Sequence, residues 1–442
     1  MCPEVRHDAY RQGSFSRIAN ALIRSSELMD ILSTGFVGTD SGSVASANAI
    51  LLERLVRRGN RVRFFSKPSF VDPRELFSGH KNASLFEFSE CTNSLTDGLR
   101  RIASPSGRGL WGRIWGGVDS SSYNRLLVQK MSKYSNSDLQ LWLGDWARHR
   151  SNHPTVSFVQ GCPGTDARSI SKHRHLIAKL AGTTKFYQLE AYARYRLRWG
   201  LPSFRCSDQV LVGSEWSRRS LHRHYGVSLD KIHAIPYPID LDSFSPNAGE
   251  RSTRGPLQLL WLGRFVPRKR LDLFLAGLEI AIRNGCDVNA VVVGRSGFVP
   301  NYEKLIEEFA FPDRIEHHPY VKRTSVPTLI RESDVMCQPS DDEDFGSSVA
   351  EALACGVPAI VGATNGTADY ICHRSIRLED SHPETLASAI SAMDESKSKG
   401  ELADPTASRQ IAEKHFSPDN VTDQLEKVLN LALEGKLSNV DA

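Results

Sequence analysis

The chain has 442 residues, of which 40% are hydrophobic and 24% are charged, and it carries a formal net charge of +4. This length is sufficient for two domains with separate cores, and the composition is typical of a folded globular protein. The mild charge, together with the lack of zinc-finger or RNA-binding signatures, argues against nucleic acid as a partner.

The eight cysteines are scattered and form no Cys-x-x-Cys pair. This usage favours reduced thiols in a cytoplasmic protein over a disulfide framework. The N-terminus has no apolar signal segment, and no run reaches the ~18 apolar residues that span a bilayer. We therefore expect a cytoplasmic protein that does not cross a membrane but can contact its inner face peripherally.

The first elements in chain order form a βαβ unit. Residues 1–30 are expected to hold a helical leader, followed by a short strand from residue 31, a helix over 45–58 and a strand over 62–65. Gly35, Gly38 and Gly42 lie in the first turn, where glycines let the backbone approach a phosphate. The spacing does not fit the Gly-x-Gly-x-x-Gly pattern of NAD-binding proteins, and a Walker-type loop is absent.

Further apolar runs predict two series of strands separated by a proline-rich linker at 245–256. The expected strands cover 84–88, 139–143, 155–159, 209–212, 257–262 and 288–293, with others near 315, 335 and 359; helices are expected at 123–134, 214–225 and 420–434. This order predicts an α/β protein with two Rossmann-like, doubly wound domains facing across a cleft. We expect an N-terminal domain at 1–245, a C-terminal domain at 257–415, and a closing helix within 416–442 that packs back on the N-terminal domain.

Two glutamates mark the C-terminal half. A buried strand near Val335 leads into an acidic turn with Glu343, and the helix that follows contains Glu351. This order places both carboxylates near the carboxyl edge of a parallel sheet, where open α/β folds bind ligands. A helix N-terminus at that edge attracts an anion, so the pair suggests a ligand with phosphates and hydroxyls. Acidic residues before a helix also act as caps, and spacing alone does not separate the two interpretations.

A basic turn follows the first strand of the same half. Arg264 and Lys269 stand after Gly263, and together they provide the charge to neutralise a diphosphate, including one that leaves during a reaction. Because Arg268 and Arg270 flank Lys269, a solvated basic turn is the alternative.

Asp342 and Asp344 have the Asp-x-Asp form that some nucleotide-sugar enzymes use to hold a divalent metal. The alternative is that they cap the loop and only Glu343 faces a ligand. A metal is less needed when Arg264, Lys269 and a helix N-terminus supply positive charge, so we expect neither a metal nor another cofactor.

Over residues 257–372 the chain resembles the donor domain of retaining GT-B glycosyltransferases of family 4 (glycosyl transferases group 1). The matching positions are Gly263, Arg264, Lys269, Val293, Gly294, Ser333 to Val335, Glu343 to Gly346, Glu351, Gly356 to Pro358, Asn365 and Gly366. The first half resembles the family more loosely, around 35–59 and 206–244.

The resemblance implies a role for each matching position. Arg264 and Lys269 would hold the diphosphate of a nucleotide-sugar donor, Glu343 the hydroxyls of the transferred sugar, and Glu351 the ribose. Backbone near Val321 would hold the base. The backbone amides of Phe345, Gly346 and Ser347 would meet sugar or phosphate. To the same donor site we assign Gly38, from the glycine-containing first turn, and Gly263, from the basic turn.

The implied function is retaining transfer of a sugar to a glycan, lipid-linked or small-molecule acceptor, as in polysaccharide biosynthesis. Three positions depart from the family pattern: Arg270 replaces a glycine, Gln160 stands where a sugar-contacting histidine is common, and Asp369 replaces a glutamate. Two alternatives stay open, a non-catalytic subunit that binds sugar nucleotides and a metal-dependent transferase that uses Asp342 and Asp344. For membrane contact, the candidates are the aromatic and basic stretches 107–117 and 168–198.

Overall fold

The computed structural model describes residues 28–38, 42–65, 79–86, 124–198, 204–247 and 253–440. The expected leader at 1–30 lies almost entirely outside these residues, and the 107–117 stretch lies wholly outside them. Within them, all six cysteines are free thiols, at positions 162, 206, 286, 337, 355 and 372. None of the described helices combines the length and apolar character needed to cross a bilayer.

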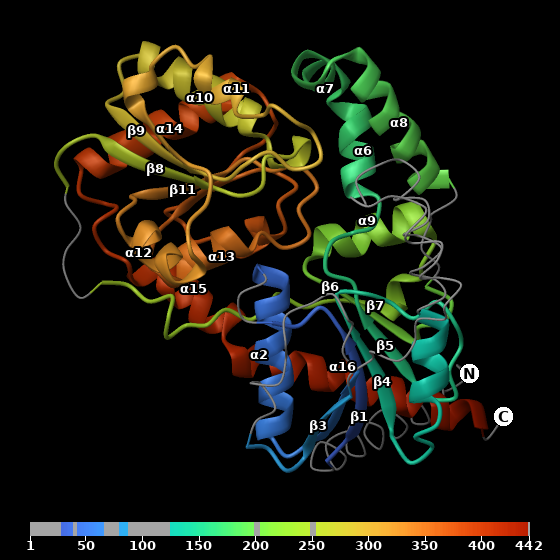
Figure 1. The fold of residues 1–442 in the computed structure, drawn as a ribbon. Coiled ribbons are helices and arrows are strands. Elements are labelled where there is room, and N and C mark those ends of the chain that lie inside the picture. The colour runs from blue at the N-terminus through green and yellow to red at the C-terminus, as the bar shows by residue number, and fades with distance from the viewer. Residues whose placement is uncertain are drawn as a thin grey trace, which may run out of the picture.

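The described residues form two lobes, each built on a parallel sheet (Figure 1). The first sheet has the order β3-β2-β1-β4-β5-β6-β7, and the second has the order β10-β9-β8-β11-β12-β13. The first sheet's strands are β1 (Asp30–Gly35), β2 (Arg61–Phe65), β3 (Ala83–Phe86), β4 (Leu139–Leu143), β5 (Thr155–Phe158), β6 (Gln209–Val212) and β7 (Ile232–Ala234). The second sheet's are β8 (Leu257–Leu262), β9 (Val288–Val293), β10 (Ile315–His318), β11 (Val335–Gln338), β12 (Ala359–Val361) and β13 (Ile376–Arg377). The predicted fold class, two Rossmann-like α/β domains, is confirmed.

Helices cover both sheets because central parallel strands bury both faces and leave no side for water. In the first lobe, α2 (Ser43–Arg57) and α9 (Glu215–Tyr225) pack on the sheet, while α6 (Thr165–Lys172), α7 (Arg174–Ala181) and α8 (Thr183–Arg198) pack on one another. The second lobe has α10 (Leu271–Arg283), α11 (Lys304–Glu307), α12 (Val326–Arg331), α13 (Ser347–Ala354), α14 (Pro383–Ser398) and α15 (Thr406–Phe416). The last helix, α16 (Pro418–Val440), returns to the first lobe. A further helical segment, 124–131, precedes β4.

The last helix, α16, runs along the first sheet and beside α2 (Figure 1). Its buried side chains include Val421, Leu425 and Leu429. At its edge, Arg58 donates to Asp423 at 2.6 Å and to Glu426 at 2.7 Å. Exposed ion pairs stabilise little, so the apolar face contributes most of the attachment.

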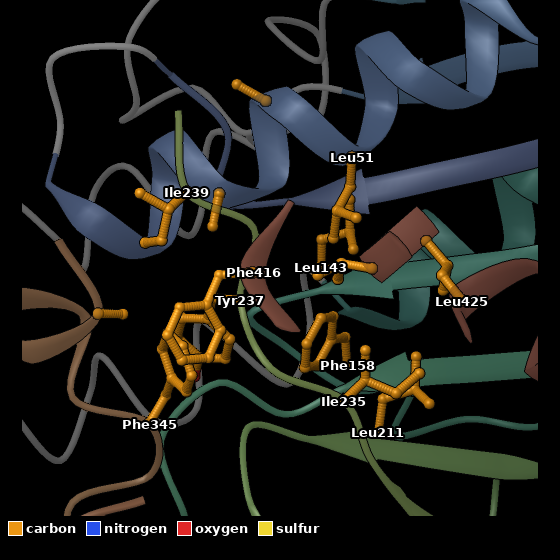
Figure 2. Packing of buried hydrophobic residues seen from close by; sticks show 14 of the residues in the cluster. Leu51, Leu143, Phe158, Leu211, Ile235, Tyr237, Ile239, Phe345, Phe416 and Leu425 are labelled. Atoms are coloured by element: carbon orange, nitrogen blue, oxygen red, sulfur yellow. The ribbon is translucent and has the colours of Figure 1, made fainter. Parts of the chain in front are cut away.

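An aromatic cluster joins the two lobes. Tyr237, from the crossing segment after β7, packs against Phe345 of the second lobe with ring centroids 4.8 Å apart (Figure 2). Phe416, at the end of α15, lies 5.3 Å from Phe345, and Phe158 of β5 lies 5.6 Å from Tyr237. Residues on both sides of the cleft therefore belong to one continuous core.

Arg409 of α15 fixes the segment that crosses between the lobes. One of its terminal nitrogens, Nη1, donates to the carbonyls of Leu241 (3.1 Å), Phe244 (2.7 Å) and Ala354 (3.0 Å). Replacing Arg409 by methionine keeps much of the apolar length but leaves these carbonyls without that donor. We expect the free energy of unfolding to fall by about 2 kcal/mol. Urea denaturation measures this loss, and Lys414→Met, at an exposed position of α15, should change little.

Candidate active site

The acidic loop after β11 is held in place by the turn that follows β12. The backbone N–H of Glu343 donates to the carbonyl of Thr364 (3.1 Å), and the N–H of Gly366 donates to the carbonyl of Glu343 (3.1 Å). Gly346 ends the loop with φ 92°, and a Cβ there would lie 2.3 Å from Asn365 Oδ1. A glycine is therefore required where the loop enters α13.

Glu343 is held by two cations through a single oxygen. Its Oε2 lies 2.6 Å from Arg268 Nη1 and 2.8 Å from Lys269 Nζ. Burial alone would raise the pKa of Glu343, but the charges of Arg268 and Lys269 outweigh it and lower the pKa to about 2. No hydrogen bond within the described residues engages Oε1, so this oxygen is open to a ligand hydroxyl.

Glu351 lies in α13, buried from solvent. Arg323 Nη2 donates to its Oε1 at 2.6 Å. The guanidinium of Arg323 also lies over the ring of Phe244, 4.8 Å from its centroid. The carboxylate of Glu351 is thus paired with Arg323, a contact that the sequence did not indicate.

A cavity of about 710 Å³ lies between the lobes and gathers nearly all of the predicted site. Its lining includes the predicted residues Gly263, Arg264, Lys269, Val321, Glu343, Phe345, Gly346, Ser347 and Glu351. The exception is Gly38, which is buried and donates its N–H to the carbonyl of Ala45 (3.3 Å). Gly42, Ser43 and Val44 line the cavity from that side.

Arg264 differs from the other cations of the site because it is exposed. No hydrogen bond or ion pair within the described residues engages its guanidinium, whereas Lys269 is partly buried and pairs with Glu343. Arg264 lines this cavity and a second one beside it. It is therefore ready to meet an anionic ligand without first leaving a protein carboxylate.

The other carboxylates of the loop have structural partners. Asp341 joins the lobes, because Lys172 Nζ (2.7 Å) and His173 Nε2 (3.3 Å) reach it from the first lobe and Arg270 (3.2 Å) from the second. Burial acts against the charge of Asp341, but His173, Lys172 and Arg270 outweigh it and hold its pKa well below the usual range.

Asp344 is buried, accepts from the Tyr237 hydroxyl, and receives the Gly213 N–H at 3.2 Å. Burial raises the pKa of Asp344. Within the described part of the chain, no three His, Cys, Asp or Glu side chains form a group suited to a metal ion. Asp344 is thus engaged by Tyr237 and Gly213, which weighs against its use as a metal ligand with Asp342.

Gln160, which stands where the family often has histidine, lines both cavities. Asn48 Nδ2 donates to the carbonyl of Phe36 (2.8 Å) and to Gln160 Oε1 (2.7 Å). This contact fixes the orientation of the Gln160 amide. Sequence reasoning identified the position but not Asn48, which lies far away along the chain.

Arg268 is the functional residue that sequence reasoning undervalued. Its Nη1 contacts Glu343, and its Nε donates to Asp166 of α6 at 2.8 Å, so it links the two lobes at the cavity. In the sequence it was only a basic neighbour of Lys269. Its distance along the chain from Asp166 gave no signal of this contact.

Family models match both halves of the chain. "Glycosyl transferases group 1" matches residues 248–410, and "Glycosyltransferase Family 4" matches residues 136–243. A D-inositol 3-phosphate glycosyltransferase of Xylanimonas cellulosilytica is 32% identical over 177 residues, which cover 36% of this chain and 42% of that protein. The uncharacterized glycosyltransferase YqgM of Bacillus subtilis is 29% identical over 184 residues, covering 42% of this chain and 50% of YqgM. The matches thus span half or less of these relatives' length.

Solved structures with the same fold cover nearly the whole chain. Sucrose-phosphate synthase from Thermosynechococcus elongatus superposes with a TM-score of 0.62 at 15% identity, over 92% of this chain and 100% of its own. Anabaena HepE in complex with UDP and glucose superposes with a TM-score of 0.59 at 15% identity, over 91% of this chain and 99% of HepE. The solved structures show the two-domain GT-B fold, and the two family matches identify the chain as a member of the group 1 glycosyltransferases.

Proposed function

We propose that the protein is a retaining glycosyltransferase that moves a sugar from a nucleotide diphosphate donor to a hydroxyl acceptor. The observation that carries this proposal is the state of Glu343. Its Oε2 is anchored by Arg268 and Lys269 while Oε1 has no partner within the described residues, inside the cavity between the lobes. An anchored carboxylate beside a free cation suits a ligand that has both hydroxyls and a diphosphate.

In this proposal the donor occupies the 710 Å³ cavity. Arg264 and Lys269 hold the diphosphate, Glu343 Oε1 accepts from a sugar hydroxyl, and Glu351 orients the ribose. The N–H groups at the start of α13 add positive potential, and backbone near Val321 faces the base. The volume lies within the range of small-molecule sites.

The reaction breaks the bond between the anomeric carbon and the diphosphate oxygen. The acceptor oxygen bonds to the same face of that carbon, and its proton passes to an oxygen of the leaving diphosphate. Arg264 and Lys269 stabilise the charge that develops on the diphosphate, an effect that acts on the transition state more than on the bound donor.

The function is tested by incubating the protein with a panel of nucleotide sugars and measuring release of the nucleotide diphosphate. UDP-glucose is the first probe. NMR of the product reports whether the anomeric configuration is retained. Thermal shift with the free nucleotides identifies the base, because a ligand at 100 times its Kd adds about 2.7 kcal/mol of stability. A protein that binds no nucleotide and releases none would contradict the proposal.

Replacing Arg264 by alanine should raise the donor KM and lower kcat/KM by about 10- to 100-fold, because one charge-assisted contact is lost. The melting temperature should stay unchanged, since Arg264 is exposed and unpaired within the described residues. Steady-state kinetics with the donor varied make the measurement. Arg283→Ala is the matched control, because Arg283 pairs with Glu279 on α10 and does not line the cavity. Equal donor KM values in Arg264→Ala and the parent protein would exclude the role.

A further inference from the structure

A second cavity, of about 520 Å³, lies beside the donor cavity and shares Gln160, Arg264, Arg268 and Glu343 with it. The remainder of its lining comes from the loop after β4, the segment that leads into α6, and α8, including Trp146, Asp166 and Tyr192. Under the proposed function, a molecule in this cavity lies next to the transferred sugar. The cavity is therefore the place where an acceptor meets the donor.

The charges of this cavity are mostly negative. Its carboxylates are Asp166, Asp342, Glu343 and Asp344, and its cations are Arg264 and Arg268. Arg268 is already neutralised by Asp166 and Glu343. Arg264 also faces the donor cavity, where the proposed function assigns it to the diphosphate. Among the described lining residues, no cation remains for a second phosphate.

Asp342 is the one carboxylate of the acidic loop that makes no hydrogen bond or ion pair within the described residues. Its backbone N–H donates to Thr364 Oγ1 at 2.9 Å, and its φ of 48° lies in the left-handed region. The carboxylate lines the cavity. A carboxylate accepts hydrogen bonds from a hydroxyl and repels a phosphate, which carries about −1.5 to −2 charges at neutral pH.

Two N–H donors of the cavity wall also lack acceptors within the described residues. These are Trp146 Nε1 and Gln160 Nε2, both closed to water. The Trp146 ring contacts Phe204 (centroids 5.5 Å apart) and the guanidinium of Arg148 (5.2 Å from the ring centroid). Because Trp146 and Gln160 both line the cavity, a ligand there is placed to supply ring oxygens as acceptors. A hydroxylated ring both donates and accepts, so it matches Asp342 and the N–H groups together.

We propose that this second cavity binds the acceptor and selects an uncharged hydroxylated ring, a sugar or a cyclitol, over its phosphorylated form. Asp342 contacts the hydroxyls of that ring and rejects the phosphate. This inference rests on the proposed function and adds the class of acceptor to it.

The test uses the full chain, the nucleotide sugar that it hydrolyses, and paired acceptors: glucose, N-acetylglucosamine and myo-inositol, each with its monophosphate. We expect at least one neutral ring to be preferred by 10-fold or more in kcat/KM. Asp342→Asn keeps a residue that tolerates left-handed backbone. It should lower kcat/KM for the neutral acceptor about 10-fold, mainly through the acceptor KM, and narrow the discrimination against the monophosphate. Every kinetic parameter should stay unchanged in Asp313→Asn, at an exposed position of the same lobe.

Three results would overturn this inference while leaving the proposed function intact. The first is a preference for the monophosphates, and the second is an Asp342→Asn protein with parental acceptor kinetics. The third is failure of all neutral rings as acceptors while donor hydrolysis continues. A protein that neither hydrolyses a nucleotide sugar nor binds a nucleotide would instead refute the proposed function.

Discussion

Replacing Glu343 by glutamine is expected to lower kcat/KM for the donor by about 100-fold, because a charged hydrogen bond to the transferred sugar contributes about 1.5–3 kcal/mol. The same change should destabilise the fold. Arg268 and Lys269 would remain close together, without the carboxylate that they share through Oε2. The cost should be about 3 kcal/mol, the size expected when one partner of a buried ion pair is removed.

The loss of stability in Glu343→Gln should depend on pH in a definite direction. A carboxyl group whose pKa is lower in the folded state stabilises the fold above its unfolded pKa, and that contribution is lost as the pH falls through the folded value. The stability difference between the parent protein and Glu343→Gln should thus be complete above pH 4.5 and should fade towards pH 2. Urea denaturation at a series of pH values measures it.

Nucleotide binding separates the two effects of Glu343→Gln. The freed cations Arg268 and Lys269 should bind a diphosphate at least as well as before, so the variant should show a UDP-induced rise in melting temperature no smaller than that of the parent. A variant that loses UDP binding along with activity would indicate a collapsed site. Parental activity in the variant would remove Glu343 from the proposed chemistry.

Much of the fold could be predicted because central parallel strands have short, mostly apolar sequences. The strands expected at 139–143, 209–212, 257–262 and 288–293 have the bounds that the structure gives. These strands are largely buried, so most residues of each run are apolar, with one Gln or Asn in each, and a glycine follows each run directly. The order of strands and helices then left few topologies to consider.

The partners of the charged residues could not be predicted in the same way. The sequence predicts Glu343 and Lys269 after the carboxyl ends of two strands of the same half, and their side chains meet at 2.8 Å. It gave no sign that Arg268 would reach Asp166, or that Arg323 would pair with Glu351, because these contacts depend on how loops from distant parts of the chain fold over the sheets. The loose glycine pattern predicts Gly38 in the donor site, but Gly42 lines the cavity, because the spacing of glycines does not determine the backbone path of a loop.

Phe345→Ala is expected to combine a large loss of stability with a loss of activity, because this ring lies at the seam of the lobes (Figure 2). Phe345 is 1% exposed and packs against Tyr237 and Phe416. Truncation of such a side chain leaves a cavity and costs about 3–5 kcal/mol. Phe345 also lies between Glu343 and Gly346 in the sequence of the acidic loop, so removal of its ring should let this loop move. Because small displacements of positioning residues slow a reaction strongly, kcat should fall by about 10-fold or more.

Phe309→Ala is the matched control, because Phe309 is buried in the same lobe but does not line the donor cavity. It should lose comparable stability and keep the donor KM and kcat of the folded protein. Phe345→Leu keeps most of the apolar volume and should fold, so kinetics can be measured even if the alanine variant does not. If Phe345→Leu has parental kcat and Phe309→Ala does not, the packing of Phe345 between the lobes does not control the rate of the reaction. The opposite pattern would mean that the packing which joins the two lobes also sets the position of Glu343.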